Sequence, residues 1–511
     1  MRTFWISTLG CKVNHYESEQ LATLLRARGL TQVAHADEAD LCIVNTCSIT
    51  TQAASKSRQS VRRAVNLPPA CGSQAPANRR VIVTGCWATS DPDQAVAIPG
   101  VRAVLGHHQN IADELQRLLI LWESDDQHAS VSATTGLQHC RHLPKSLGND
   151  GWMTRAGSSA PRLAANSKAL PFHPVKENLD EKPANLTGTI SLPQLTDRQD
   201  AHQRAFLKVQ DGCDAWCSYC IIPKLRPNVW SKPVQQVIEE ARAMVAAGHP
   251  EIVLTGIFLG AYGQATALRR RQANKFQSGI RDLVEALCTR VPGLRRLRLS
   301  SLEPGDLSEE LLAVLRSHRQ VVPHFHLPLQ SGSDAMLRRM NRQYSRDDFL
   351  RMVDRVRRTF DRPALTTDVI VGFPGESDEE FDRTLEVVAA AGFIHVHAFP
   401  FSPRPGTAAA RWNRDLVPGS VVNERIAELN RRAAEQSLAF RRQFVGQVAE
   451  IMVEKLPDPA RSRPGPAFVQ HGRCERYFPV HFEHEQVLTG RCVPVRIDRV
   501  TPARTFGTLI S

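Results

Sequence analysis

Residues 205–223 read AFLKVQDGCDAWCSYCIIP and place three cysteines within eight positions, directly after a strand-like stretch. The stretch 205–210 is rich in apolar residues and is a strand candidate. Cys213, Cys217 and Cys220 follow it with the spacing CxxxCxxC. Because ligands bind at the carboxyl ends of strands in parallel α/β folds, this spacing predicts a metal site at a strand end.

Five more strand candidates follow this motif, and helical segments such as 233–247 and 379–391 separate them. The six strand candidates are 205–210, 251–257, 294–301, 324–329, 365–373 and 393–399. Six strand–helix units in this order predict an incomplete (βα)6 barrel with its chemistry at the C-terminal strand ends.

Three thiolates can hold three irons of a cubane 4Fe–4S cluster and leave the fourth iron open to a cofactor. A zinc site and a plain electron-transfer cluster are the alternatives, but no second ligand pair with zinc-type spacing follows the motif. One CxxxCxxC after the first strand of such a barrel resembles the signature of radical S-adenosylmethionine enzymes. S-adenosylmethionine is therefore expected to bind the open iron through its amino and carboxylate groups.

Other candidate contacts to this cofactor follow the later strands. Gly256 offers close backbone approach, Glu303 could bind ribose hydroxyls, and the remaining residues lie near the expected adenosine. Trp216 and Tyr219 could pack on the adenine or shield the cluster. The predicted cofactor contacts are Gly256, Ser301, Glu303, Gln330, Ser331, Gly332 and Gly372.

Residues 1–120 alternate strand and helix patterns, which predicts a parallel sheet. Strand candidates are 2–8, 40–45 and 79–85, with helices at 17–29 and 50–65.

Cys11, Cys47 and Cys86 each come just after one of these three strands. Buried structural thiols are the alternative for any one of them. For three cysteines at corresponding strand ends we favour a second three-cysteine cluster. Cys42 lies within a strand and is expected in the core, whereas the other single cysteines show no ligand-like spacing. These are Cys71, Cys140, Cys288, Cys474 and Cys492.

The chain is expected to divide into four segments. Residues 122–203 are polar with little periodicity and predict a flexible insert or linker. Residues 420–442 form a charged helix, and short alternating apolar runs after it predict a small β-barrel with basic edges. The predicted segments are an N-terminal domain at 1–121, the insert at 122–203, the barrel at 204–440 and the C-terminal module at 441–511.

The bulk composition fits an α/β enzyme of several domains with a polyanionic partner. The chain has 511 residues and a net charge of +12, which suits nucleic acid but also an ordinary basic enzyme. The clustered cysteines indicate metal binding in a reducing compartment, so a cytoplasmic location is expected. No apolar run approaches the 18 residues of a membrane helix.

Together these motifs resemble the methylthiotransferase family of radical S-adenosylmethionine enzymes, over about 1–120 and 204–511. Within it, TLGCKVNHYESEQ (8–20) and FLKVQDGCDAWCSYCIIP (206–223) resemble the subgroup that acts on threonylcarbamoyladenosine in tRNA. Lys12 and Val13 favour this subgroup, since the isopentenyladenosine subgroup tends to read GCQMN and the ribosomal-protein subgroup GCPKN.

The resemblance implies 2-methylthiolation of threonylcarbamoyladenosine 37, beside the tRNA anticodon. It implies two 4Fe–4S clusters, S-adenosylmethionine as methyl and radical source, and an electron donor such as a flavodoxin or ferredoxin. Cys11, Cys47 and Cys86 match its auxiliary cluster, and the CxxxCxxC cysteines its radical cluster. Rival readings are the same chemistry on isopentenyladenosine or a ribosomal-protein aspartate, or a non-catalytic iron–sulfur RNA-binding protein.

Two departures from the family and one group of RNA-binding candidates complete the prediction. Residues 224–227, KLRP, replace the usual aromatic and Arg-Gly pair, and Pro227 fixes φ and lacks a backbone donor. The insert at 122–203 is longer than the usual connection. The C-terminal module resembles a TRAM domain, and its candidate RNA contacts are Arg473, Arg476, Arg491, Tyr477 and Phe478, the last favoured as core.

Overall fold

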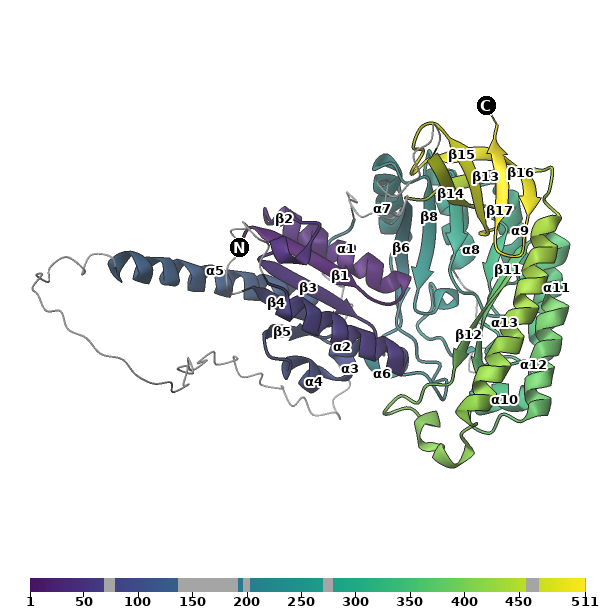
Figure 1. Ribbon diagram of the computed structural model, residues 1–511, viewed down its shortest axis with the longest axis horizontal. Helices are drawn as coiled ribbons and strands as arrows, with labels where there is room; N and C mark the ends of the chain where they lie inside the picture. The colour runs from purple at the N-terminus through teal and green to yellow at the C-terminus, as the bar shows by residue number, and fades with distance from the viewer. Residues whose placement is uncertain (69–78, 137–191, 196–202, 270–278, 456–467, 511) are drawn as a thin grey trace, which may run out of the picture. The chain divides into compact units, whose positions relative to one another are not determined.

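The computed structural model describes residues 1–68, 79–136, 192–195, 203–269, 279–455 and 468–510 (Figure 1). It has two units, of which the first comprises Met1 with 109–192 and the second comprises 2–108 with 193–511. Helix α5 (Ile111–Gly136) lies in the first unit. No helix in the described ranges is both long and apolar enough to cross a membrane.

The N-terminal part of the second unit is a parallel five-stranded sheet in the order β2-β1-β3-β4-β5. Its central strand, β3, is buried at all six positions, as its apolar sequence predicts. The strands are β1 (Thr3–Thr8), β2 (Thr31–Gln32), β3 (Leu41–Thr46), β4 (Arg80–Gly85) and β5 (Val101–Leu105). The helices are α1 (Lys12–Ala27), η1 (Ala36–Glu38), α2 (Thr51–Asn66), α3 (Cys86–Ser90) and α4 (Pro92–Val96).

The six predicted barrel strands are present and parallel, in two sheets ordered β7-β6-β8-β9 and β10-β11-β12. A bridge between Leu297 and Val321 links the sheets, and β12 does not pair with β6 in the described part of the chain. The predicted incomplete barrel is therefore confirmed. Its strands are β6 (Arg204–Asp211), β7 (Trp230–Ser231, antiparallel), β8 (Glu251–Gly256), β9 (Arg296–Leu299), β10 (His324–His326), β11 (Ala364–Val371) and β12 (His395–Pro400).

Amphipathic helices follow the barrel strands and bury one apolar face in a single large core. Capping boxes at Ser345 and Ser377 start two of them. The helices are α6 (Ile222–Leu225), α7 (Val234–Ala246), α8 (Ile280–Arg290), α9 (Glu309–Ser317), α10 (Asp334–Arg339), α11 (Arg346–Thr359), α12 (Asp378–Ala391) and α13 (Gly419–Arg442). Short 3-10 turns are η2 (Leu259–Ala261), η4 (Ala409–Arg411) and η5 (Asn413–Asp415).

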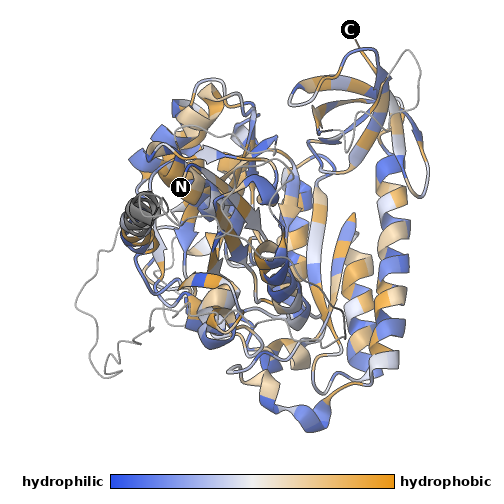
Figure 2. Ribbon diagram, turned by 60° about the vertical axis from the view of Figure 1, so that its left-hand side comes forward, coloured by the Kyte–Doolittle hydropathy of each residue, from blue (hydrophilic) through white to orange (hydrophobic). Residues whose placement is uncertain are grey.

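The C-terminal module is a closed five-stranded barrel in the order β13-β14-β15-β17-β16, as predicted. Figure 2 shows apolar and polar residues alternating along its strands. Phe478 is 4% exposed and lies in its core. The strands are β13 (Val448–Val453), β14 (Phe468–Cys474), β15 (Pro479–His484), β16 (Cys492–Val500) and β17 (Thr505–Leu509).

The predicted insert differs from the structure at its beginning. The expected boundary at 121/122 falls inside α5, because the helix continues to Gly136. Most of the remaining insert, with Cys140, lies outside the described residues, as does Cys71.

Candidate active site

The CxxxCxxC loop turns away from β6 at Gly212, which has φ +77°. A Cβ atom at this position would lie 1.9 Å from the Asn228 carbonyl oxygen, so only glycine fits. The Cys213 amide donates to the Arg226 carbonyl oxygen over 3.1 Å. The segment with Pro227 therefore packs directly against the first cysteine of the loop.

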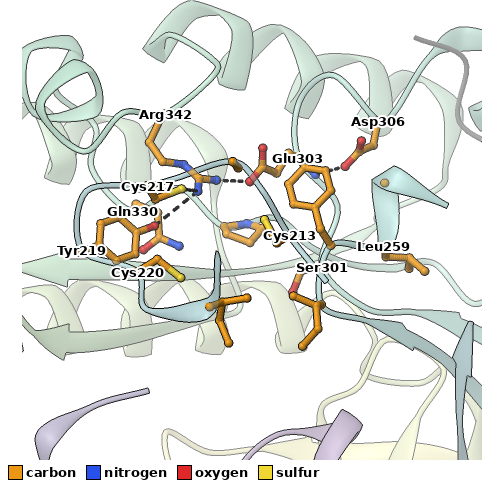
Figure 3. A pocket seen from close by; sticks show the side chains of 16 residues that line it. Cys213, Cys217, Tyr219, Cys220, Leu259, Ser301, Glu303, Asp306, Gln330 and Arg342 are labelled. Carbon is orange, nitrogen blue, oxygen red and sulfur yellow. Dashed lines mark hydrogen bonds and ion pairs between the residues drawn. The ribbon is translucent and has the colours of Figure 1, made fainter. Parts of the chain in front are cut away.

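The three cysteines of the loop line one cavity of about 190 Å³ at the C-terminal end of the barrel strands (Figure 3). Ser301, Glu303 and Gln330, three of the predicted cofactor contacts, line the same cavity. Tyr219 also lines it, whereas Trp216 is 54% exposed.

The other predicted contacts occupy different surroundings. Gly256 precedes the cavity-lining residue Ile257 and abuts Gln210. Ser331 and Gly332 are buried against Thr384 of α12, and Gly372 approaches Val422 of α13. Each of these four positions thus has a packing neighbour that accounts for it.

Arg342 is a site residue that the sequence did not reveal. Its Nη1 donates to the Cys217 sulfur over 3.2 Å and to the Tyr219 hydroxyl over 3.4 Å, and Nη2 pairs with Glu303. Figure 3 shows the guanidinium between the carboxylate and the thiols. Burial lowers the pKa of Arg342, but Glu303 outweighs this and raises it well above its usual value. A fixed positive charge therefore lies against the cysteine loop.

Without a bound metal, Cys213 and Cys220 of this loop resist deprotonation. Burial raises the pKa of Cys220 to about 12 and also raises that of Cys213, and the neighbouring thiolates add to both shifts. Metal coordination offsets this repulsion, because a cation binds the thiolate form of each ligand. Three free thiols that line one cavity beside Arg342 fit a cluster with one open iron.

The second group of cysteines lies at the C-terminal ends of β1, β3 and β4. Cys11 directly precedes α1, Cys47 follows β3, and Cys86 begins α3. A Cβ atom added to Gly10 would lie 3.1 Å from the Cys47 sulfur, so this turn runs close beside that thiol. Burial raises the pKa of Cys86, and the charges of Cys11 and Cys47 raise it further. The fold thus gathers the three free thiols, and this donor set fits a second iron–sulfur cluster.

A buried ionic network joins the N-terminal sheet to the barrel between these two groups of cysteines. Arg226 binds both carboxylate oxygens of Glu17 over 2.7 and 2.8 Å and also pairs with Asp211 over 2.9 Å. Lys208 bridges the same carboxylates. The Nε2 atom of His107 lies 3.0 Å from Arg226 and 3.8 Å from the Cys86 sulfur. The network therefore reaches from the CxxxCxxC loop to a cysteine of the N-terminal group.

The candidate RNA contacts of the C-terminal module divide into two kinds. Arg476 donates to the Arg362 carbonyl oxygen over 2.9 Å, and Arg473 pairs with Glu454. Tyr477 packs against arginines of the barrel. Arg491 is exposed. Only the last of these four side chains is thus fully available at the surface of the described structure.

Comparison with known proteins agrees with this geometry. Residues 207–388 match the Radical SAM superfamily, and residues 3–106 match a family described as Uncharacterized protein family UPF0004. The Bacillus subtilis threonylcarbamoyladenosine tRNA methylthiotransferase MtaB is 32% identical over 97% of this chain and 94% of its own. A tRNA-2-methylthio-N(6)-dimethylallyladenosine synthase of Novosphingobium aromaticivorans is 31% identical over 99% of this chain and 97% of its own.

A solved radical S-adenosylmethionine methyltransferase from Kitasatospora setae is similar with a TM-score of 0.49 and 15% identity, covering 80% of this chain and 77% of that one.

Fold, cysteine loop and family match define a radical S-adenosylmethionine enzyme, which implies a 4Fe–4S cluster and S-adenosylmethionine. The relatives that match most of the chain narrow the class: the protein belongs to the methylthiotransferase family of radical S-adenosylmethionine enzymes.

Proposed function

We propose that this protein methylthiolates C2 of threonylcarbamoyladenosine at position 37 of tRNA. The observation that carries the proposal is the pair of three-thiol groups at the C-terminal ends of parallel strands in two sheets. Curated relatives at 32–33% identity bear this activity in their names. The division into segments 1–121, 122–203, 204–440 and 441–511 belongs to the same proposal, with α5 continuing past the first boundary to Gly136.

Two clusters are part of the proposal. Cys213, Cys217 and Cys220 would hold the radical cluster, and Cys11, Cys47 and Cys86 the auxiliary cluster. When bound, these groups and S-adenosylmethionine supply a carbon-centred radical, a sulfur atom and a methyl group.

The residues of the chain position and shield these groups. Arg342 donates to the sulfur of Cys217 and holds Glu303 beside the cavity. There the Glu303 carboxylate can accept hydrogen bonds from ribose hydroxyls. Ser301 and Gln330 offer further polar contacts. Gly256, Ser331, Gly332 and Gly372 would support the site through packing of its walls rather than by contact.

The partners follow from the substrate. A net charge of +12 favours binding of the tRNA anticodon loop, whose unstacked bases can enter a pocket. A small electron carrier such as a flavodoxin or ferredoxin would reduce the radical cluster, and these partners imply a cytoplasmic location.

Two experiments test the proposal. The reconstituted protein should hold about eight irons per chain, and the Cys11/Cys47/Cys86→Ala triple variant about four. That variant should still form 5′-deoxyadenosine but no methylthio product. An unchanged iron content in the triple variant would contradict the assignment of an auxiliary cluster to these three cysteines.

The second candidate substrate is dimethylallyladenosine, because a relative named for it is 31% identical over 99% of this chain. Nucleoside analysis of tRNA from a deletion strain distinguishes the two. Loss of the methylthio group from threonylcarbamoyladenosine alone supports the proposal, and loss from dimethylallyladenosine alone contradicts it.

A further inference from the structure

We propose that the lumen of the barrel contains an anion subsite that binds the threonyl carboxylate of the substrate, with Lys12 as its specificity-determining residue. This inference rests on the proposed function, because it takes threonylcarbamoyladenosine as the substrate.

Lys12 is the first residue of α1, and its side chain is half-buried. Its ammonium lies within electrostatic reach of Arg204, Arg298 and Tyr477. It also acts on groups of the last three barrel strands, namely His324, Asp368 and His397. The Lys12 ammonium thus interacts electrostatically with residues of five barrel strands, β6, β9, β10, β11 and β12. This places it in the lumen that these strands surround.

Two polar atoms in this cluster are buried and have no hydrogen-bond partner in the described parts of the chain. Arg298 Nη2 is buried and unpaired, although Nε of the same residue donates to Glu251 over 2.8 Å. His324 Nδ1 is also buried and unpaired, and this nitrogen carries the ring hydrogen when Nε2 accepts from Thr366. Unsatisfied buried donors are costly, so an acceptor from outside the chain is expected.

Positive charge exceeds negative charge at this place. The nearby carboxylates already have partners, since Glu251 binds Arg298 and Glu454 binds Arg204. Tyr477 adopts φ +72° and stacks on His324 with ring centroids 4.7 Å apart, and arginine side chains flank it. A bulky residue with this backbone conformation is held by its surroundings.

A cation is the alternative occupant, because His326, Asp368 and His397 have ligand atoms within 4.8 Å of one another. Asp368 already accepts from His326 over 3.1 Å, and Lys12 brings a positive charge to the same group. The anion is therefore favoured.

The chemistry of the substrate matches the position of Lys12. Threonylcarbamoyladenosine carries a carboxylate on its N6 substituent, whereas dimethylallyladenosine carries none. N6 and C2 lie on the same edge of adenine, separated by N1. Lys12 directly follows Cys11, a proposed auxiliary-cluster ligand. Binding of the carboxylate at Lys12 would hold C2 on the side of that cluster.

The test compares two anticodon stem-loops, one with threonylcarbamoyladenosine and one with its neutral carboxamide. The wild-type holoenzyme should prefer the carboxylate by about 10- to 100-fold in kcat/KM, the range of a charge-assisted hydrogen bond. Lys12→Gln should lose this preference by slowing only the carboxylate substrate, and Lys12→Arg should retain part of it. Lys56→Gln, at an exposed lysine of the same domain, should match the wild type.

Affinities of the two stem-loops, measured by fluorescence anisotropy, should show the same change and do not depend on turnover. Equal affinities and rates for both substrates in the wild type, or equal losses in Lys12→Gln at normal iron content, would overturn the subsite alone. No turnover of either substrate by the wild type, with turnover of a dimethylallyladenosine stem-loop, would overturn the proposed function and the subsite with it.

Discussion

Arg342 contacts both the cysteine loop and Glu303. Its side chain is 7% exposed, and replacing it by glutamine leaves the Glu303 carboxylate buried with a weaker partner. Breaking a buried pair in this way costs about 3–5 kcal/mol of unfolding free energy. We expect Arg342→Gln to lower the free energy of unfolding of the iron-free protein by roughly this amount, as measured in urea.

The double variant Arg342→Gln/Glu303→Gln separates charge from packing. Because it removes the uncompensated carboxylate as well, it should be more stable than Arg342→Gln alone. Arg338→Gln, at an exposed position of the neighbouring helix α10, should change the unfolding midpoint little. A double variant less stable than the single one would contradict the assigned pair.

At the scale of elements, α1 is fastened to β6 by one carboxylate. Burial alone would raise the pKa of Glu17, but the charges of Arg226 and Lys208 outweigh it and hold this pKa well below its usual value of 4.5. The stabilising contribution is therefore present above pH 4.5 and is lost as the pH falls through the lowered pKa. Glu17→Gln should cost roughly 3 kcal/mol near pH 7, measured in urea.

The pH dependence of this loss checks the sign. The difference in unfolding free energy between wild type and Glu17→Gln should shrink below about pH 4, because protonation then removes the same charge from the wild type. Glu309→Gln, at an exposed position of α9, should show no comparable difference. A difference that stays constant down to pH 2 would exclude Glu17 as the titrating group.

The sequence predicts what is local and misses what depends on distant pairing. Buried strands and the CxxxCxxC loop are contiguous, so their apolar runs and cysteine spacing are visible in the sequence. Arg342 lies 125 positions from Cys217, and Glu17 lies 209 from Arg226, so neither pair leaves a local pattern. A glycine after a strand indicates close approach of another group, but not whether that group is a cofactor or, as at Gly372, a helix.

On the scale of the whole molecule, the C-terminal barrel is fixed to the radical-enzyme barrel by charge. Arg296 is 3% exposed and binds Glu251 and Glu450, one carboxylate from each barrel. Arg476 donates across the same junction to the Arg362 carbonyl oxygen, whereas Arg473 pairs with Glu454 inside the C-terminal module. Arg296 and Arg476 therefore serve the junction of the two barrels, and we expect exposed cations such as Arg491 to contact tRNA under the proposed function.

Salt dependence tests this division of the arginines. The logarithm of the tRNA association constant falls linearly with the logarithm of the salt concentration, and each phosphate contact adds about 0.7–0.9 to the steepness of this slope. Arg491→Gln should therefore reduce that slope by about one contact and weaken every tRNA alike, whereas Arg316→Gln, exposed on α9, should leave it unchanged. Filter binding at salt concentrations from about 50 to 200 mM measures the slope of both variants. Loss of a phosphate contact reduces the number of counterions released on binding. An unchanged salt slope in Arg491→Gln would therefore show that Arg491 does not contact a tRNA phosphate, and the tRNA-binding surface would have to be assigned elsewhere.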